Sequence, residues 1–119
     1  MFNLKNVRDT VIGKKTTLEG SLQSSDDIRI LGKVTDDVVS KHKVTVHKNG
    51  SVLGKIIAKD SLIQGEVEGD LDISGKVELE SSAKIEGNIQ AKILKVHTGV
   101  VFNYLLNKKE EILIANVEK

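Results

Sequence analysis

The chain has 119 residues, enough for one domain, and nothing in its composition indicates a second. Its 18 basic and 17 acidic residues give a net charge of +1, so the charge gives no reason to expect a nucleic-acid partner. The absence of cysteine excludes disulfides and thiolate metal sites and suits the cytoplasm, and the chain begins without the apolar stretch of a secretory signal.

Residues 1–15 are expected to form a flexible N-terminal tail that mixes apolar and basic side chains. The tail is a candidate membrane-targeting peptide, with the residues Met1, Phe2, Leu4, Lys5, Val7 and Arg8. So short a peptide buries too little apolar surface to anchor one chain stably. Many copies linked in a polymer would bind a membrane through avidity.

Residues 16–106 repeat one short unit, in which a glycine lies between two variable residues and two aliphatic ones. A shift of 33 residues carries Gly32 to Gly65 and Gly54 to Gly87. Self-similarity at a fixed period predicts a solenoid. The structural glycines, expected to provide room and unusual φ angles, are Gly20, Gly32, Gly54, Gly65, Gly69 and Gly87.

The apolar residues of each unit stand at i, i+2 and i+4, which is the period of a β-strand. Steps of 18 and 15 residues alternate along positions 36, 54, 69, 87 and 102, so each 33-residue repeat makes two coils. We therefore predict an all-β, single-stranded parallel β-helix of about six coils, each holding three short strands in a triangular cross-section. The six-residue period of left-handed β-helices starts at Ile28 but fails at Gln64, which favours a right-handed helix.

The last coil places a bulky side chain where earlier coils have small ones, because Phe102 falls on the position of Asp36 and Gly69. A ring there either plugs the open end of its own coil or meets a second subunit. Residues 107–119 are expected to form a flexible C-terminal tail. The predicted polymerisation interface contains Phe102, Tyr104, Val100, Leu105, Leu18 and Leu22.

No catalytic machinery is visible, and we expect neither an enzyme nor a bound cofactor or metal. His42, His47 and His97 fall in turns or in the outward phase of strands and are expected to be solvated. Two alternatives stay open: an enzyme of the left-handed β-helix kind, such as an acyltransferase or a metal-dependent anhydrase, and a monomeric solenoid that binds a partner.

The sequence resembles the bactofilins, bacterial cytoskeletal proteins, over about residues 16–104. The resemblance rests on the opening segment Thr17–Leu22, the glycine-spaced units and the closing Phe102. It implies a right-handed triangular β-helix that stacks end to end into non-polar filaments without nucleotide. Phe102 matches the family's phenylalanine at the subunit contact, and Met1 and Phe2, with Leu4 and Lys5, are similar to its membrane-targeting peptide.

The resemblance also implies partners and a location. The partners are other copies of the chain, the membrane surface and client proteins of envelope synthesis or polar organisation, with no nucleotide or nucleic acid. The implied location is cytoplasmic, peripheral on the inner face of the cell membrane, where such filaments support cell shape. Asp36 and Thr98 depart from the family pattern because they stand where glycine is expected, and proline-rich tails are missing.

Overall fold

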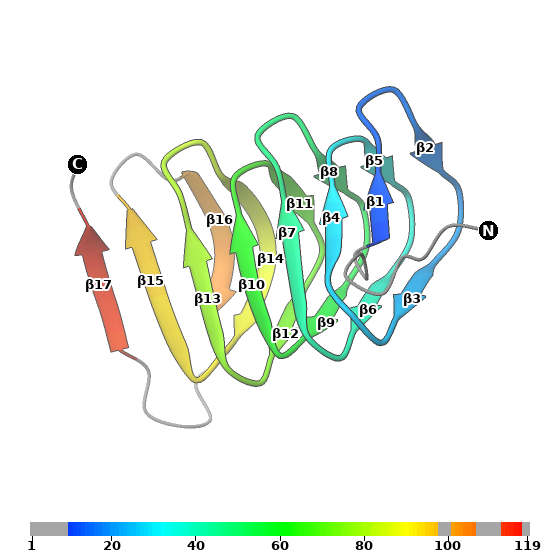
Figure 1. Cartoon of the computed structure of the whole chain (residues 1–119). Coiled ribbons are helices and arrows are strands. Elements are labelled where there is room, and N and C mark those ends of the chain that lie inside the picture. Colours follow the sequence, from blue (N-terminus) through cyan, green and yellow to red (C-terminus); the bar gives the residue numbers. More distant parts are fainter. Residues whose placement is uncertain (1–9, 98–100, 107–112, 118–119) are drawn as a thin grey trace.

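The computed structural model describes residues 10–97, 101–106 and 113–117, and in these residues the secondary structure consists of β-strands without a helix. The chain winds into a parallel β-solenoid (Figure 1). The first two turns contain β1 (Thr10–Ile12), β2 (Thr17–Leu18), β3 (Leu22–Ser24), β4 (Ile28–Ile30), β5 (Lys33–Val34) and β6 (Val38–Ser40). The next two contain β7 (Lys43–Val46), β8 (Ser51–Val52), β9 (Ile56–Ala58), β10 (Asp60–Ile63), β11 (Glu66–Glu68) and β12 (Leu71–Ile73). The remaining strands are β13 (Lys76–Leu79), β14 (Lys84–Gln90), β15 (Ile93–His97), β16 (Val101–Leu106) and β17 (Leu113–Val117).

Three faces enclose the solenoid, which gives the predicted triangular cross-section. Face A is the sheet β1-β4-β7-β10-β13-β15-β17. Face B contains β2, β5, β8, β11, the first half of β14 and β16, and face C contains β3, β6, β9, β12 and the end of β14. Five complete turns are therefore followed by β15 and β16 of a sixth, which agrees with the expected count of about six coils.

The winding is right-handed. In Figure 1 the strands of face A run upward in the foreground, the chain passes over the top to the back, and each later turn lies further to the left. This is the sense that nearly all parallel crossover connections have. The observation disagrees with the left-handed β-helix enzymes that the sequence had left as an alternative.

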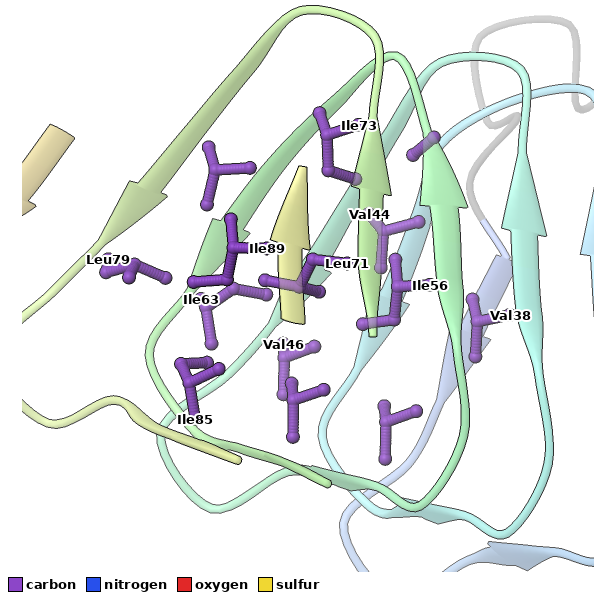
Figure 2. Close-up of a cluster of buried hydrophobic side chains, with 14 of the residues drawn as sticks. Val38, Val44, Val46, Ile56, Ile63, Leu71, Ile73, Leu79, Ile85 and Ile89 are labelled. Atoms are coloured by element: carbon purple, nitrogen blue, oxygen red, sulfur yellow. The ribbon is translucent and has the colours of Figure 1, made fainter. Parts of the chain in front are cut away.

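The core lies between the faces and consists of columns of aliphatic side chains, one per turn. On face B the column contains Val34, Val52, Val67 and Ile85, all at most 2% exposed. Alternating side chains point outward, so the strands bury every second residue, as the period of two predicts. Figure 2 shows these side chains filling the space between the faces.

The 33-residue period arises at the corner between faces A and B. The turn there has four residues in the third and fifth coils, at 47–50 and 80–83, and two in the second and fourth, at 31–32 and 64–65. Each four-residue turn is closed by a backbone hydrogen bond of 2.8 Å, from Gly50 to His47 and from Ala83 to Glu80. Long and short coils therefore alternate, and two coils make one repeat.

Four aspartates repeat with the same period and hold successive turns together at the other two corners. The backbone N–H of Lys43 donates to Asp27 and that of Lys76 to Asp60, at 3.3 and 3.0 Å. At the corner between faces B and C, Asp37 and Asp70 accept from the backbone N–H groups of residues 55 and 88, at 2.9 and 3.1 Å. These carboxylates satisfy donors that strand pairing leaves free where the chain bends.

The corner glycines lie where turns approach closely. Gly69 and Gly87, at the corner between faces B and C, have φ angles of +157° and +142°, which side chains rarely adopt. A Cβ at Gly69 would stand 2.2 Å from the carbonyl oxygen of Gly54 in the turn before. Asp36 occupies the same corner one turn earlier without a positive φ, so the departure from the family pattern is accommodated by a different local backbone.

Both boundaries of the solenoid differ from the expected ones. Thr10–Ile12, placed by sequence in the N-terminal tail, forms β1 and pairs with β4. Leu113–Val117, placed in the C-terminal tail, forms β17 and pairs with β15. Each segment adds a strand to face A because its backbone continues the ladder of the neighbouring turn.

Candidate polymerisation interface

The first turn forms one end of the solenoid. Within the described ranges, β1, β2 and β3 each pair with a single strand, so their outer edges carry backbone N–H and C=O groups without a strand partner. The side chains of Ile12, Leu18 and Leu22 come one from each face and continue the columns of the core. They are only half-buried, because no further turn covers them in the described part of the chain.

Sequence analysis found two of these three residues. Leu18 and Leu22 belong to the predicted interface, and the structure places both on this end face. Ile12 was missed because it was assigned to the tail. The signal was present, since one 18-residue step from Ile30 leads to Ile12, and the structure pairs these two residues in register.

The register of β16 corrects the predicted position of Phe102. Phe102 pairs with Ile85 and so continues the core column of face B, whereas Tyr104 pairs with Gly87 in the corner column of Asp36 and Gly69. The reason is the length of the last coil, which advances 17 residues from Ile85 instead of the expected 15.

Three further positions complete the second end of the solenoid. Leu105 pairs with Asn88, and Leu106, which sequence analysis did not single out, pairs with Ile89 in the core column of face C. In the described residues β16 pairs with β14 alone and β17 with β15 alone, so both present a free strand edge.

Several predicted residues lie outside the part of the chain that the structure describes. They are Val100 and Thr98 near the second end, and the membrane-targeting set Met1, Phe2, Leu4, Lys5, Val7 and Arg8. Among the described residues no helix is long and apolar enough to cross a bilayer.

His97 is not the solvated side chain that the sequence predicted. Its ring is 15% exposed, and its Nε2 lies 3.0 Å from Glu78 Oε2, so the two residues join β13 to β15. This hydrogen bond lowers the pKa of Glu78 below its ordinary value, against the opposing effect of burial, and the charges of Lys95 and Lys76 lower it further. His42 is exposed as expected, whereas His47 is half-buried and its Nε2 has no hydrogen-bond partner.

Glu78, Glu80 and His97 also offer ligand atoms that all lie within 4.8 Å of one another, a spacing that a divalent ion could bridge. Other bonds already use these side chains. Glu78 binds His97, and the Gln64 side-chain amide donates to Glu80 at 3.3 Å. The cluster therefore works as a polar clip that links the fourth, fifth and sixth turns.

Comparison with known proteins decides the family. A family model described as "Bactofilin: Polymer-forming cytoskeletal" matches residues 10–105, which is most of the chain and nearly the whole solenoid. The chain belongs to the bactofilin family. As a bactofilin it is a polymer-forming cytoskeletal protein, and the β-helix expected from the resemblance is confirmed.

Two curated bactofilins from Myxococcus xanthus (strain DK1622) are similar to the chain. Bactofilin BacO is 30% identical over 94 residues, which cover 79% of this chain and 75% of BacO. Bactofilin BacP is 26% identical over 97 residues, which cover 82% of this chain but 40% of BacP. The chain thus spans less than half of BacP. No solved structure shows a significant match.

Proposed function

We propose that this bactofilin polymerises by stacking its solenoids end to end, without nucleotide. The observation that carries the proposal is the end face of the first turn, where three strand edges have no strand partner and Ile12, Leu18 and Leu22 are half-buried. A second solenoid placed on this face would pair the edges and cover the apolar side chains.

The energy for this step comes from burial and pairing. Completing the burial of a half-buried Leu or Ile contributes roughly 1 kcal/mol, half of the value for the whole side chain. Three such side chains from each subunit contribute about 6 kcal/mol per joint before the cost of association. Backbone hydrogen bonds add about 1 kcal/mol each. A joint of this strength needs no nucleotide to form.

Non-polar filaments require that like ends meet, which a two-fold axis perpendicular to the solenoid achieves. If the axis passes through face A, β1 pairs with the same strand of the other subunit in antiparallel orientation. The axis then exchanges faces B and C, so β2 of one subunit meets β3 of the other. All three apolar residues of the end face become buried at such a joint.

A pair of variants on β3 tests the end contact. Leu22 points inward on the end face, and its neighbour Gln23 is exposed on the outside of the same strand. Leu22→Arg should abolish filaments in nucleotide-free electron microscopy while circular dichroism retains the β signal, and Gln23→Arg should leave the filaments intact. Filaments that survive both Leu22→Arg and Phe102→Arg would contradict end-to-end stacking.

The proposal extends to the location of the filaments, which lie on the cytoplasmic side along the inner face of the cell membrane and support cell shape or envelope organisation. The N-terminal peptide, with Phe2 and Leu4 as apolar anchors and Lys5 and Arg8 as basic ones, is the membrane contact. A filament carries many copies of this weak anchor, so avidity makes the attachment stable. The protein has no catalytic role in this proposal.

Deleting residues 2–8 tests the membrane contact. The truncated protein should still form filaments but should no longer co-sediment with liposomes. Undiminished co-sedimentation would refute the anchor. If light scattering showed a monomer at high concentration, the third interpretation, a monomeric binding module, would replace the filament.

A further inference from the structure

The charged side chains of the solenoid are segregated among its three edges, although the described residues carry equal numbers of positive and negative charges. We define each edge as the turns between two faces together with the adjoining strand ends. The B–C edge carries six acidic residues and one lysine, a net charge of −5: Glu19, Asp36, Asp37, Lys55, Glu68, Asp70 and Glu86. All seven are exposed.

The two edges that border face A have the opposite sign. The A–B edge has a net charge of +3, from Lys14, Lys15, Lys33, Lys48, Glu66, Glu80 and Lys84. The C–A edge has a net charge of +2, from Asp26, Asp27, Lys41, Lys43, Lys59, Asp60, Lys76 and Lys92. The four charges on the middles of the faces, those of Arg29, Asp72, Glu78 and Lys95, cancel.

The positive edges are stronger outward than their net charge suggests. Asp27 and Asp60, two of the three acidic residues on the C–A edge, accept backbone N–H groups of the next turn. The side chains of Lys41, Lys59 and Lys92 on the same edge are exposed and have no hydrogen bond or ion pair within the described residues. These lysines can therefore contact a partner without breaking a bond of the solenoid.

We infer that the acidic B–C edge docks against a lysine-rich edge of a second copy of this chain, so that filaments associate side by side. Every copy carries both signs on parallel edges of one rigid body, so each edge finds its complement on an identical molecule. A bilayer with anionic lipids would engage the lysine-rich edges and leave the acidic edge without a partner. A second copy uses both kinds of edge, which favours it as the occupant.

The inference rests on the proposed function, because a single lateral contact is weak. An exposed ion pair contributes about 0–1 kcal/mol. In a filament the same edges recur with every subunit, so two filaments are joined by many weak contacts at once. Like-charged edges repel, which orients the filaments so that an acidic edge faces a lysine-rich one.

Two glutamates on β11 provide a matched test. Glu66 and Glu68 are both exposed on face B, two residues apart, but Glu68 lies on the acidic B–C edge and Glu66 on the lysine-rich A–B edge. Each change to lysine alters the net charge by the same amount. Glu68→Lys weakens the acidic edge, and Glu66→Lys strengthens a lysine-rich one. Adding Glu19→Lys to Glu68→Lys reduces the B–C edge further.

The measurement is the salt concentration at which bundles separate into single filaments, followed by electron microscopy and low-speed sedimentation. Wild-type bundles should form in low salt and separate as the screening length shrinks from about 10 Å at 0.1 M towards about 3 Å at 1 M. Glu68→Lys should lower the separating concentration about two-fold, and the double variant should give single filaments throughout. Glu66→Lys should leave the concentration unchanged or raise it.

Equal shifts for Glu66→Lys and Glu68→Lys would overturn the inference, because only the total charge would then matter. Single wild-type filaments in low salt would also overturn it while leaving the proposed polymerisation intact. Binding to phosphatidylglycerol vesicles without any bundling would assign the lysine-rich edges to a membrane instead. If no filament formed at all, the proposed function would fail and this inference with it.

Discussion

Replacing Gly69 by alanine tests whether the corner between faces B and C holds adjacent turns at the spacing described above. The new Cβ would lie 2.2 Å from the carbonyl oxygen and 2.6 Å from the carbonyl carbon of Gly54. Both atoms belong to backbone that is fixed in the preceding turn, so no side chain can move aside. The φ of +157° adds strain that glycine avoids.

The expected loss combines two effects. A residue other than glycine in this backbone region costs about 1–3 kcal/mol, and forcing extra atoms into a packed site costs a further 1–3 kcal/mol or so. The reduced entropy of the unfolded chain offsets about 0.4–1 kcal/mol. We therefore expect Gly69→Ala to lower the free energy of unfolding by about 2–5 kcal/mol.

Gly20 provides the control because its φ is also positive, at +131°, but no atom lies within 4 Å of its added Cβ. Gly20→Ala pays only the conformational cost, offset by the same entropy, and should lose about 1 kcal/mol. Thermal unfolding of both variants, followed by circular dichroism at one protein concentration, should separate their midpoints by roughly 5–10 °C. Equal midpoints would refute the close approach of the turns at Gly69.

Three further predictions concern the body of the solenoid. Ile56 is fully buried and its neighbour Ile57 is 36% exposed, so Ile56→Ala should cost about 2–5 kcal/mol in a urea melt and Ile57→Ala under about 1 kcal/mol; similar losses would contradict the inward column. Asp70→Ala removes the acceptor of the Asn88 backbone N–H, so hydrogen exchange at that amide should accelerate, and unchanged protection would count against the aspartate contact. The lowered pKa of Glu78 means that its charged form stabilises the fold above the ordinary value of 4.5, and this contribution disappears as pH falls through the folded-state pKa. The stability advantage of wild type over Glu78→Gln should therefore shrink on acidification below 4.5, and an advantage independent of pH would show that the contact with His97 has no such role.

Much of the fold follows from local pattern. Val34, Val52 and Val67 stand at positions whose period of two and glycine spacing predict an inward column, and the structure buries all three. Such residues are predictable because each strand repeats the environment of the one before it. The aspartates at 27 and 60 repeat with the period too, but their role depends on a bond to the next turn, which the sequence does not show.

The ends of the solenoid were harder to predict, because the repeat is irregular there. Phe102 was displaced by two residues since the last coil advances by 17, and β1 was taken for tail because no glycine-spaced unit marks it. His97 was expected in solvent from its outward phase alone. Its burial depends on Glu78 in the neighbouring turn, a contact between residues 19 positions apart.

Fibre diffraction from oriented, nucleotide-free filaments tests the central claim most directly. If the solenoids stack end to end, their strands lie across the filament and the spacing between neighbouring strands, about 4.8 Å, should appear as a reflection along the filament axis. Leu22→Arg should remove the filaments and Gln23→Arg should preserve this reflection. A strand reflection perpendicular to the filament axis would show that the subunits join through their sides, and would contradict the account.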